Sequence, residues 1–401
     1  MRVLVCPAMM EIGGSQTNAV ELAKGVADLG HDVVLFCPDG DLLDTVRNFG
    51  LQYELAPRER SWPSRHNMHA LNRLVRERAI DVVHGYEWGP AIDLAFGPHL
   101  RYGVPVVTTV MSMSVPDFLP RHTPLLVGTA RLRAEQARTR DGVRLMEPPI
   151  DTVRNAPGDG HSARARFGFR PDEFIVTVVG RLVTDLEKVH GIIEAISAVD
   201  ALAETVPIRL LVVGDGSGLA QVRACADTVN ARHGRDTILV AGALMDPRDA
   251  YDAADVVLGM GSSALKGLAF AKPLVVQGAA GFWKLLDDSS LAMFLEHGWY
   301  GARGGGAVEL AGILHRLYAA PSVRDELGEF GRALVSDRFS LARASGDLVG
   351  IYSEAIGNRP SPLRSWSGLA SSAVRLAKFK FALQRHRWAT WRGPARLRGA
   401  Q

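Results

Sequence analysis

The sequence predicts an α/β fold with two Rossmann-like domains that face a cleft, followed by a basic C-terminal tail. Three observations predict it. The chain has 401 residues, and at about 150 residues per domain this length favours two domains. Short apolar runs alternate with segments of helical periodicity, which is typical of βαβ units and a parallel sheet. The alternation stops at 147–168, where Pro, Gly and Asp are frequent, and then begins again.

The first half of the chain contains short, continuous apolar runs of the kind that form buried parallel strands. The expected strands lie at 1–7, 31–38, 51–57, 79–86, 105–112 and 124–130. Segments with apolar residues at helical spacing separate several of them, at 17–30, 42–50 and 67–79. The first of these segments ends at Gly30, a residue favoured just after a helix.

The second half repeats the pattern. Expected strands lie at 173–181, 207–216, 237–244, 254–261 and 272–278, and expected helices at 189–203, 219–234 and 262–271. We therefore predict an N-terminal domain over 1–155, a second domain over 156–340, a helix at 341–358 that returns towards the first domain, and a tail over 359–401. Ligands of such sheets bind outside the carboxyl ends of the strands, so both domains are expected to contribute to one cleft.

The composition excludes several classes of protein. Hydrophobic residues make up 47% and charged residues 22% of the chain, which is ordinary for a globular protein and excludes disordered, collagen-like and disulfide-scaffold classes. The three cysteines include no CxxC pair, which favours a reducing cytosol and gives no zinc signature. No apolar run has the length of a membrane span, and the N-terminal residues favour a first strand over a signal peptide. We therefore expect a cytoplasmic protein.

The tail at 359–401 differs in charge from the rest of the chain. It holds ten of the 46 Lys and Arg residues and no Asp or Glu, interleaved with Trp and Phe. Three alternatives remain open for this segment. It is an interfacial helix on an anionic membrane, an arm that binds nucleic acid or an anionic acceptor, or a solvated and partly disordered tail.

In the second half, Gly180, Arg181 and Lys188 follow the first strand. Two cations at the carboxyl end of a parallel strand suit a diphosphate, because Arg presents a fork of donors and Lys a point charge. The alternative is a solvated loop in which the cations pair with Asp185 and Glu187.

The segment at 259–271 is the most suggestive one. Glycines and serines precede a short helix, so free N–H groups, hydroxyls and the helix dipole all favour an anion there. These residues are Gly259, Met260, Gly261, Ser262 and Ser263, with Lys266 one turn into the helix. A purely structural turn is the alternative.

In the first half, Gly13 and Gly14 lie between the first strand and the first helix. This position suits an anion at a helix N-terminus, although a tight turn explains it equally well. The absence of a GxGxxG pattern argues against a nicotinamide or flavin cofactor. His84 and Glu87 follow the strand at 79–86, where they are candidates to reach a bound substrate, and a structural histidine is the alternative.

Together these segments resemble the family 4 retaining glycosyltransferases of the GT-B fold. The resemblance covers most of residues 1–357. It rests on GGSQTNAVELAKGVADLGHDV (13–33), EPPIDT (147–152), VVGRLVTDLEKVHGIIEAI (178–196), LLVVGDGSG (210–218), DPRDAYDAADVVLGMGSSALKGLAFAKPLVV (246–276) and FSLARASGDLVGIYSEAI (339–356). Each segment is weakly specific alone, whereas six in the expected order are strong evidence for the fold.

The resemblance implies a nucleotide-diphosphate sugar donor, held mostly by the second domain, with no other cofactor and no metal. Arg181 and Lys188 would neutralise the diphosphate, backbone at 259–263 would cradle its distal phosphate, and Gly13 and Gly14 would approach the sugar phosphate. Cations and amides aimed at the leaving group stabilise its developing charge. Retention follows if the acceptor attacks from the face that the diphosphate leaves.

Three positions depart from the family pattern. Leu258 and Lys266 stand where the family has two glutamates, and Met111 stands where it often has a histidine. Lysine cannot accept a hydrogen bond from ribose but can hold a phosphate or a carboxylate, and Met111 cannot transfer a proton. We therefore assign acceptor recognition and catalysis to His84 and Glu87.

The sequence thus predicts a glycosyltransferase that uses a nucleotide sugar and a hydroxyl or amine acceptor. We expect it in the cytoplasm, with the tail as a contact to the inner face of the membrane, and we expect no nucleic acid partner. The alternatives are a non-catalytic binding protein with a glycosyltransferase-like fold, a Rossmann oxidoreductase and, more weakly, an epimerase.

Overall fold

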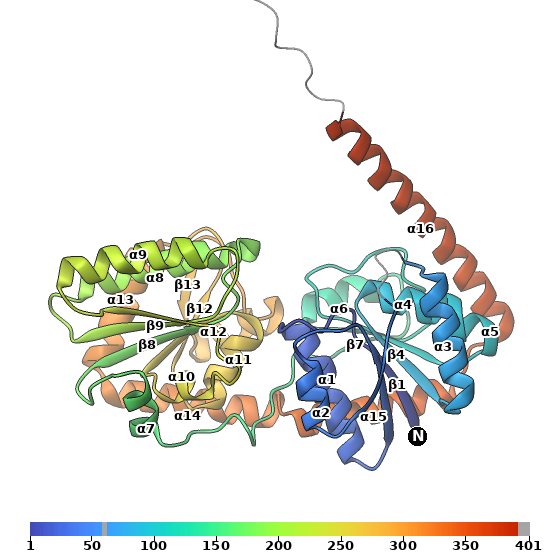
Figure 1. Cartoon of the computed structure of the whole chain (residues 1–401), viewed down its shortest axis with the longest axis horizontal. Helices are drawn as coiled ribbons and strands as arrows, with labels where there is room; N and C mark the ends of the chain where they lie inside the picture. Colours follow the sequence, from blue (N-terminus) through green and yellow to red (C-terminus); the bar gives the residue numbers. More distant parts are fainter. Residues whose placement is uncertain (58–61, 392–401) are drawn as a thin grey trace, which may run out of the picture. The chain divides into compact units, whose positions relative to one another are not determined.

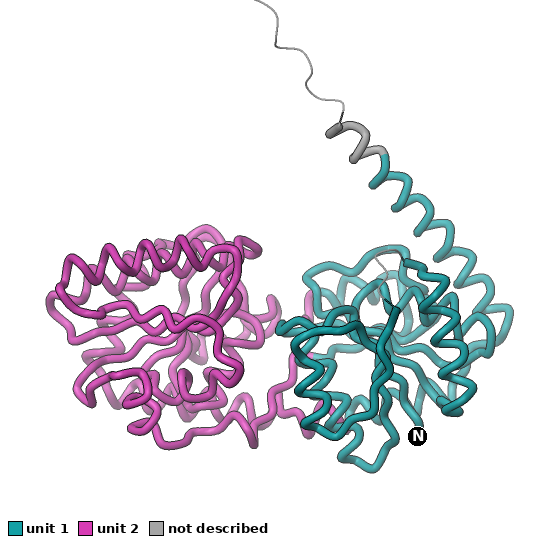
Figure 2. Tube along the Cα trace, in the orientation of Figure 1, with its two compact units in different colours: residues 1–128, 132–146, 347–401 teal, residues 129–131, 147–346 magenta. Residues whose placement is uncertain are grey.

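The computed structural model describes residues 1–57 and 62–391, with no side-chain description beyond residue 384. The chain forms two compact units (Figure 2). Unit 1 contains residues 1–128, 132–146 and 347–401, and unit 2 contains residues 129–131 and 147–346. The division near residue 146 lies nine residues before the predicted boundary at 155.

Unit 1 is built on a parallel sheet of seven strands in the order β3-β2-β1-β4-β5-β6-β7. The strands are β1 (Arg2–Cys6), β2 (Asp32–Cys37), β3 (Gln52–Leu55), β4 (Val82–Tyr86), β5 (Val106–Val110), β6 (Leu125–Val127) and β7 (Val143–Leu145). Strand order reverses between β1 and β4, which are hydrogen-bonded neighbours. Ligands of doubly wound sheets bind at such a reversal.

The helices of this part of the chain cover both faces of the sheet (Figure 1). They are α1 (Gly14–Asp28), α2 (Leu43–Asn48), α3 (Arg65–Glu77), α4 (Trp88–Leu94), the π-helical turn η1 (Ala95–His99), α5 (Leu100–Tyr102), α6 (Ala130–Ala137), α15 (Leu341–Gly357) and α16 (Pro362–Trp391). Apolar residues of β1, β2 and β4 pack with Leu71, Leu74 and Val75 of α3 in one core cluster. Alternate residues of the strands therefore face the residues of α3 that recur about once per helical turn.

Unit 2 repeats the same architecture with six strands in the order β10-β9-β8-β11-β12-β13. They are β8 (Phe174–Val179), β9 (Ile208–Val213), β10 (Ile238–Gly242), β11 (Val256–Gly259), β12 (Leu274–Gln277) and β13 (Trp283–Leu285). All pairs are parallel except β12 with the edge strand β13. The order reverses between β8 and β11, so the predicted phosphate loops follow the two strands that flank the reversal.

Two helical layers sandwich this second sheet, as Figure 1 shows. The helices are α7 (Gly160–Arg166), the 3₁₀ turn η2 (Asp185–Glu187), α8 (Lys188–Leu202), α9 (Leu219–His233), α10 (Arg248–Asp252), α11 (Gly261–Ala269), α12 (Asp288–His297), α13 (Gly306–Ala319) and α14 (Pro321–Arg338). Residues of α8, α9 and α13 share one core cluster, and residues of α11, α12 and α14 share another. The predicted linker at 147–168 contains the helix α7. Asp159 caps the N-terminus of this helix, because its side chain accepts hydrogen bonds from the N–H groups of His161 and Ser162.

The basic tail is helical over most of its length and packs on unit 1. Helix α16 buries Leu369, Ser372 and Leu376, and the Ser372 hydroxyl donates to the Phe118 carbonyl at 2.5 Å. The part of the predicted tail at 392–401 lies outside the described residues. The segment is therefore helical up to Trp391, and its described contacts with the rest of unit 1 extend as far as Phe379 and Lys380.

Candidate functional site

The candidate donor site of unit 2 lies where the loops after β8 and β11 leave the sheet. Because β8 and β11 pair in parallel, their carboxyl ends lie side by side. The loop after β8 carries Arg181 and leads into α8 at Lys188, and the turn after β11 leads into α11. The structure thus brings the two predicted phosphate-binding segments to the same edge of one sheet.

The glycine turn after β9 holds the Arg181 loop in place. The N–H of Leu182 donates to the Asp215 carbonyl at 2.8 Å, and the N–H of Gly218 donates to the Leu182 carbonyl at 2.8 Å. Gly214 has φ +150°, and a Cβ there would lie 1.8 Å from the carbonyl oxygen of Gly180. Glycine is therefore required at Gly214 by close backbone packing, which is its structural role whether or not it contacts a ligand.

Arg181 and Lys188 place two positive charges beside each other at this edge. The Arg181 side chain is exposed and Lys188 is half-buried at the first position of α8. Burial lowers the pKa of Lys188, the Arg181 charge lowers it further, and Asp185 partly offsets both. Within residues 1–57 and 62–391, neither side chain forms a hydrogen bond or an ion pair. An anion between them would relieve the repulsion.

Helix α11 presents an open N-terminus to the same edge. Met260 occupies its N-cap position with an extended backbone and no side-chain capping bond. The Ser263 hydroxyl donates to the Met260 carbonyl at 2.9 Å and therefore does not cap the helix. The N–H of Gly261 donates to the Trp299 carbonyl at 3.0 Å, so the N–H groups of Ser262 and Ser263 are the ones open to another acceptor. Gly261 has φ +55°, a conformation that favours glycine at this turn.

Lys266 lies on α11, half-buried and, among the described residues, without an ion-pair partner. Leu258, another departure from the family pattern, is fully buried in β11 and packs in the core with α8. Leu258 therefore belongs to the core, whereas Lys266 remains a candidate ligand contact.

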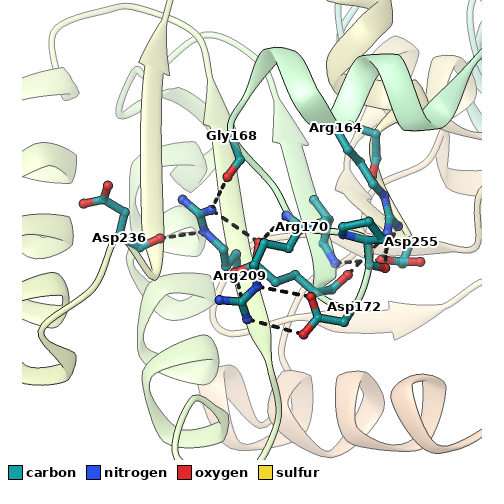
Figure 3. Close-up of polar contacts among 11 residues, drawn as sticks. Arg164, Gly168, Arg170, Asp172, Arg209, Asp236 and Asp255 are labelled. Carbon is teal, nitrogen blue, oxygen red and sulfur yellow. Dashed lines mark hydrogen bonds and ion pairs between the residues drawn. The ribbon is translucent and has the colours of Figure 1, made fainter.

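At the amino ends of the strands of the same sheet, in contrast, arginines pair with carboxylates (Figure 3). There Arg209 pairs with Glu173 at 3.4 Å, Arg164 with Asp255 at 2.7 Å and Arg170 with Asp172 at 3.1 Å. These residues precede β8 and β11 or begin β9, so they sit at the amino ends of the strands. Arginines at the amino ends thus have carboxylate partners, whereas Arg181, Lys188 and Lys266 have none among the described residues, which is the charge distribution expected of an anion site.

In unit 1, Gly13 and Gly14 form the start of α1 directly after the loop that follows β1. Gly13 is its N-cap with extended backbone and no side-chain capping bond, and Gly14 is exposed. The helix N-terminus is therefore open to an anion.

His84 is not placed for catalysis, which corrects its predicted catalytic role. Its side chain is completely buried within β4. The Nδ1 atom lies 2.7 Å from the Tyr352 hydroxyl of α15 and the Nε2 atom lies 2.7 Å from Thr109 Oγ1. Burial lowers the pKa of His84 to about 3, so the neutral ring joins α15 to the sheet. The structural alternative accounts for His84.

Glu87 is half-buried and heavily hydrogen-bonded at the end of β4. Its Oε1 accepts from the N–H of Met111 at 3.0 Å and the hydroxyl of Ser15 at 3.1 Å, and its Oε2 accepts from the hydroxyl of Ser112 at 2.6 Å. Glu87 has φ +64°, a conformation that costs about 1–3 kcal/mol for a non-glycine residue. The carboxylate is thus fixed at the carboxyl ends of β4 and β5.

A pocket of about 380 Å³ lies beside Glu87, which is one of its walls. Its other walls are mostly apolar and include Phe36, Trp62, Leu71 and Trp88. Glu87 could be predicted from the sequence but this pocket could not, because its walls come from segments far apart in the chain. The one available signal was Trp88, an aromatic residue directly after Glu87. Another depression, of about 330 Å³, is lined by residues of β3 and α3 at the outer edge of the sheet.

In the part of the chain that the structure describes, no group of three or more His, Cys, Asp or Glu side chains could hold a metal ion. None of the helices described is both long enough and apolar enough to span a bilayer.

The amino-acid sequence matches known proteins across both units. A model of Glycosyltransferase Family 4 matches residues 12–142. The D-inositol 3-phosphate glycosyltransferase of Rhodococcus erythropolis is 25% identical over 293 residues, which span 64% of this chain and 64% of that protein. The protein of the same name from Acidothermus cellulolyticus is 24% identical over an alignment 415 positions long, which covers 89% of each protein.

Solved structures share the fold. A glycosyltransferase from Rickettsia africae superimposes with a TM-score of 0.72 at 15% identity, covering 89% of this chain and 99% of that chain. Anabaena Alr3699/HepE in complex with UDP superimposes with a TM-score of 0.68 at 16% identity, covering 88% and 100%. These matches confirm the predicted resemblance and the predicted fold of two parallel-sheet domains.

Proposed function

From the premise that the chain is a glycosyltransferase with the GT-B fold, we propose that it moves a sugar from a nucleotide-diphosphate sugar to an acceptor hydroxyl or amine. The donor diphosphate binds at the carboxyl ends of β8 and β11. The acceptor binds in the unit 1 pocket beside Glu87. Transfer proceeds with retention and without a metal.

One observation carries the donor site: Arg181, Lys188 and Lys266 are cations without ion-pair partners, among the described residues, on segments that meet at one sheet edge. The α11 N-terminus adds N–H donors at the same edge. Charge builds up on the leaving diphosphate as the glycosidic bond breaks. Fixed cations and N–H groups stabilise that charge more in the transition state than in the ground state.

UDP is the first nucleotide to test, because Anabaena Alr3699/HepE was solved with UDP and with UDP-glucose. A thermal-shift screen over UDP, GDP, ADP and dTDP, each with and without its sugar, tests the donor class. We expect one nucleotide to raise the melting temperature by several degrees and the others to have little effect.

Glu87 is proposed as the group that orients the acceptor and takes its proton. Its carboxylate is held by α1, through Ser15, and by the loop after β5, through Met111 and Ser112, and it forms a wall of the pocket. A general base must lie within hydrogen-bond reach of the proton that it removes, and among the two predicted catalytic residues Glu87 alone meets a pocket.

The non-catalytic binding protein is the main rival, favoured by Leu258 and Lys266 in place of the family's glutamates. Release of nucleoside diphosphate from the sugar nucleotide that gives the thermal shift separates the two. If the sugar nucleotide binds but no nucleoside diphosphate is released with any hydroxyl or amine acceptor, the chain is a non-catalytic binding protein. A thermal shift with NAD or NADP instead would establish an oxidoreductase, and interconversion of two sugar nucleotides without transfer would establish an epimerase.

Helix α16 is proposed to bring the enzyme to the inner face of an anionic membrane. Its packed face contacts unit 1, while Leu363, Trp366 and Phe381 are 84%, 61% and 63% exposed. Exposed Lys378 and Lys380 accompany them. Apolar side chains flanked by cations are typical of helices that lie in a membrane interface. We expect no nucleic acid partner.

A further inference from the structure

Glu87 holds a strained backbone conformation but does not use its side chain to cap a helix. Its φ of +64° and ψ of −168° lie in a region that is almost exclusive to glycine. Glu87 occupies the N-cap position of α4, yet its carboxylate makes no capping hydrogen bond there. Its N–H donates to the Thr109 carbonyl at 2.8 Å, and its carboxylate contacts the loop after β5. A strained residue of this kind is typical of a functional constraint.

The two oxygens of the Glu87 carboxylate have different surroundings. Oε1 accepts from the Ser15 hydroxyl at 3.1 Å and from the backbone N–H groups of Met111 at 3.0 Å and Ser112 at 3.2 Å. A carboxylate oxygen offers about two lone-pair sites, so these three donors leave none on Oε1 for a substrate. Among the described residues, Oε2 accepts from the Ser112 hydroxyl alone, at 2.6 Å. One lone-pair site of Oε2 is therefore open.

Ser112 fixes the oxygen that stays open. The terminal torsion of a glutamate has a broad range, so Oε1, if it were anchored alone, would be a pivot about which Oε2 could turn. The Ser112 hydroxyl opposes this rotation through a hydrogen bond of charge-assisted length, which is roughly 2.5–2.7 Å for this pair of groups. Ser15 is less critical, because Oε1 keeps two backbone donors without it. Glu87 and Ser112 both line the pocket of about 380 Å³.

We infer that Ser112 is a positioning residue that holds Oε2 of Glu87 in place to take the proton of the acceptor. As the acceptor oxygen bonds to the anomeric carbon, its proton moves to Oε2, and the electron pair of the broken carbon–oxygen bond leaves with the diphosphate. The Ser112 hydroxyl keeps its own proton and donates throughout. This inference rests on the proposed function for the role of Glu87. The alternative is that Ser112 only ties the loop after β5 to the end of β4.

Crystal structures of the parent protein and of the Ser112→Ala variant test the positioning without requiring turnover. In the variant we expect Oε1 to keep its contacts with the backbone N–H groups of positions 111 and 112, and Oε2 to leave the place that it has in the parent. Ser112→Thr retains a hydroxyl and should leave the carboxylate where it is. A carboxylate that Ser112→Ala leaves unmoved would overturn the inference.

Kinetics test whether this positioning matters for transfer. The donor is the sugar nucleotide that the thermal-shift screen selects, with UDP-glucose first, and the acceptor probes are glycerol and water. We expect Ser112→Ala to lower kcat for release of nucleoside diphosphate about tenfold or more, with an unchanged KM for the donor, because a displaced base loses its alignment. Ser112→Thr should recover most of the activity. Ser15→Ala should lower kcat only about twofold, since one of three donors to Oε1 is lost.

A double variant separates positioning from a structural role. If Ser112 acts only through the carboxylate, Glu87→Gln with Ser112→Ala should have the same kcat as Glu87→Gln alone. Ser114→Ala, an exposed change in the same loop, is the control and should behave as the parent. Effects of the two substitutions that multiply, or an unchanged kcat in Ser112→Ala, would overturn the inference and leave the proposed function standing.

Failure of the proposed function has a different signature. An unchanged kcat in Glu87→Gln would refute the role of Glu87 as the base, whatever Ser112→Ala does. If no acceptor supports release of nucleoside diphosphate, the proposed transfer fails, and the crystal structure of Ser112→Ala alone then decides whether the hydroxyl positions Oε2.

Discussion

The backbone N–H of Met111 donates a 3.0 Å hydrogen bond to the carboxylate of Glu87. The N–H of Ser112 donates to the same oxygen at 3.2 Å. Because both contacts come from the main chain, the identity of the side chain at 111 does not affect them. The position where the resembled family often has histidine thus serves here as a backbone clamp on an acid that the loop after β4 supplies.

Glu87→Gln should separate chemistry from structure. The amide retains an oxygen for the Met111 and Ser112 N–H groups but cannot take a proton, so we expect kcat to fall by about 10²-fold or more while the melting temperature changes by a few degrees at most. Glu135→Gln, an exposed change on α6, is the control. Steady-state kinetics with the donor identified by the nucleotide screen provide the measurement, and an unchanged kcat would remove Glu87 from the mechanism.

Arg181→Glu should abolish most of the preference for a diphosphate. In the parent protein we expect UDP, or the nucleotide that the screen selects, to bind much more tightly than its nucleoside, because the diphosphate meets Arg181 and Lys188. The variant should bring the two affinities within a few-fold of each other in calorimetric titration. The exposed Arg223→Glu on α9 should behave as the parent. A diphosphate preference that survives charge reversal would place the donor elsewhere.

The fold was largely predictable because its signals are local. Continuous apolar runs predicted β1 to β6 and β8 to β12, each close to its observed position. The strands β7 and β13 were missed because each has three residues, and a charged side chain interrupts both, Arg144 in β7 and Lys284 in β13. The helix α7 was missed because Gly and Asp around it are typical of a linker.

Some residues of the candidate sites could likewise be predicted from local sequence, whereas others depend on residues far away in the chain. Phosphate loops are set by consecutive residues and strand order, so Arg181, Lys188 and the α11 start could be placed from the sequence. The burial of His84 could not, because it depends on Tyr352, which lies 268 residues away in the chain. The pocket could not be predicted for the same reason. Its walls Trp62 and Trp88 are held by contacts with Phe118, and no spacing pattern in the sequence links these three residues.

Gly214→Ala should destabilise unit 2 and disturb the donor loop. A Cβ at Gly214 would overlap the Gly180 carbonyl oxygen, and its φ of +150° is unfavourable for alanine. We expect a loss of about 2 kcal/mol or more in the free energy of unfolding, together with weaker nucleotide binding. Gly346 is an exposed position of α15 with open space around it, so Gly346→Ala should be neutral or stabilising by up to about 1 kcal/mol. Urea unfolding compares the two, and equal effects would contradict the packing argument.

Lowering the pH should reduce the free energy of unfolding of unit 1 already at pH values above those at which carboxylates become protonated. Burial lowers the pKa of His84 to about 3 and, with the His99 and Arg364 charges, that of His122 to about 4. Burial also lowers the pKa of His99. In the unfolded chain these histidines take up protons near pH 6.5, so the unfolded state binds more protons below that pH. Their contribution is complete above about pH 6.5 and declines below it, by up to about 1.4 kcal/mol per pH unit for each histidine.

Urea unfolding between pH 7.5 and pH 5 tests this sign. The free energy of unfolding should be flat above pH 6.5 and fall steadily below it. His84→Gln should reduce the slope, whatever its effect on stability at pH 7.5. A stability that rises on acidification, or a slope that His84→Gln leaves intact, would show that the buried rings accept protons in the folded state.

Membrane association through α16 should depend on its exposed face and not on its packed one. Deleting 359–401 is a poor test, because Leu376 and Ser372 of α16 pack on unit 1 and their loss would destabilise the domain.

We therefore choose Lys378→Glu with Phe381→Ser, both exposed in α16. This pair should reduce co-sedimentation with phosphatidylglycerol vesicles several-fold, and raising the salt from 50 to 500 mM should weaken the parent in the same way. The matched pair Arg223→Glu with Val308→Ser changes an exposed cation and an exposed apolar residue in unit 2 and should sediment as the parent does. Equal sedimentation of the parent and both pairs, or binding insensitive to salt, would leave α16 as a purely structural helix, since charge and exposed apolar area are the two terms that draw a helix to such a surface.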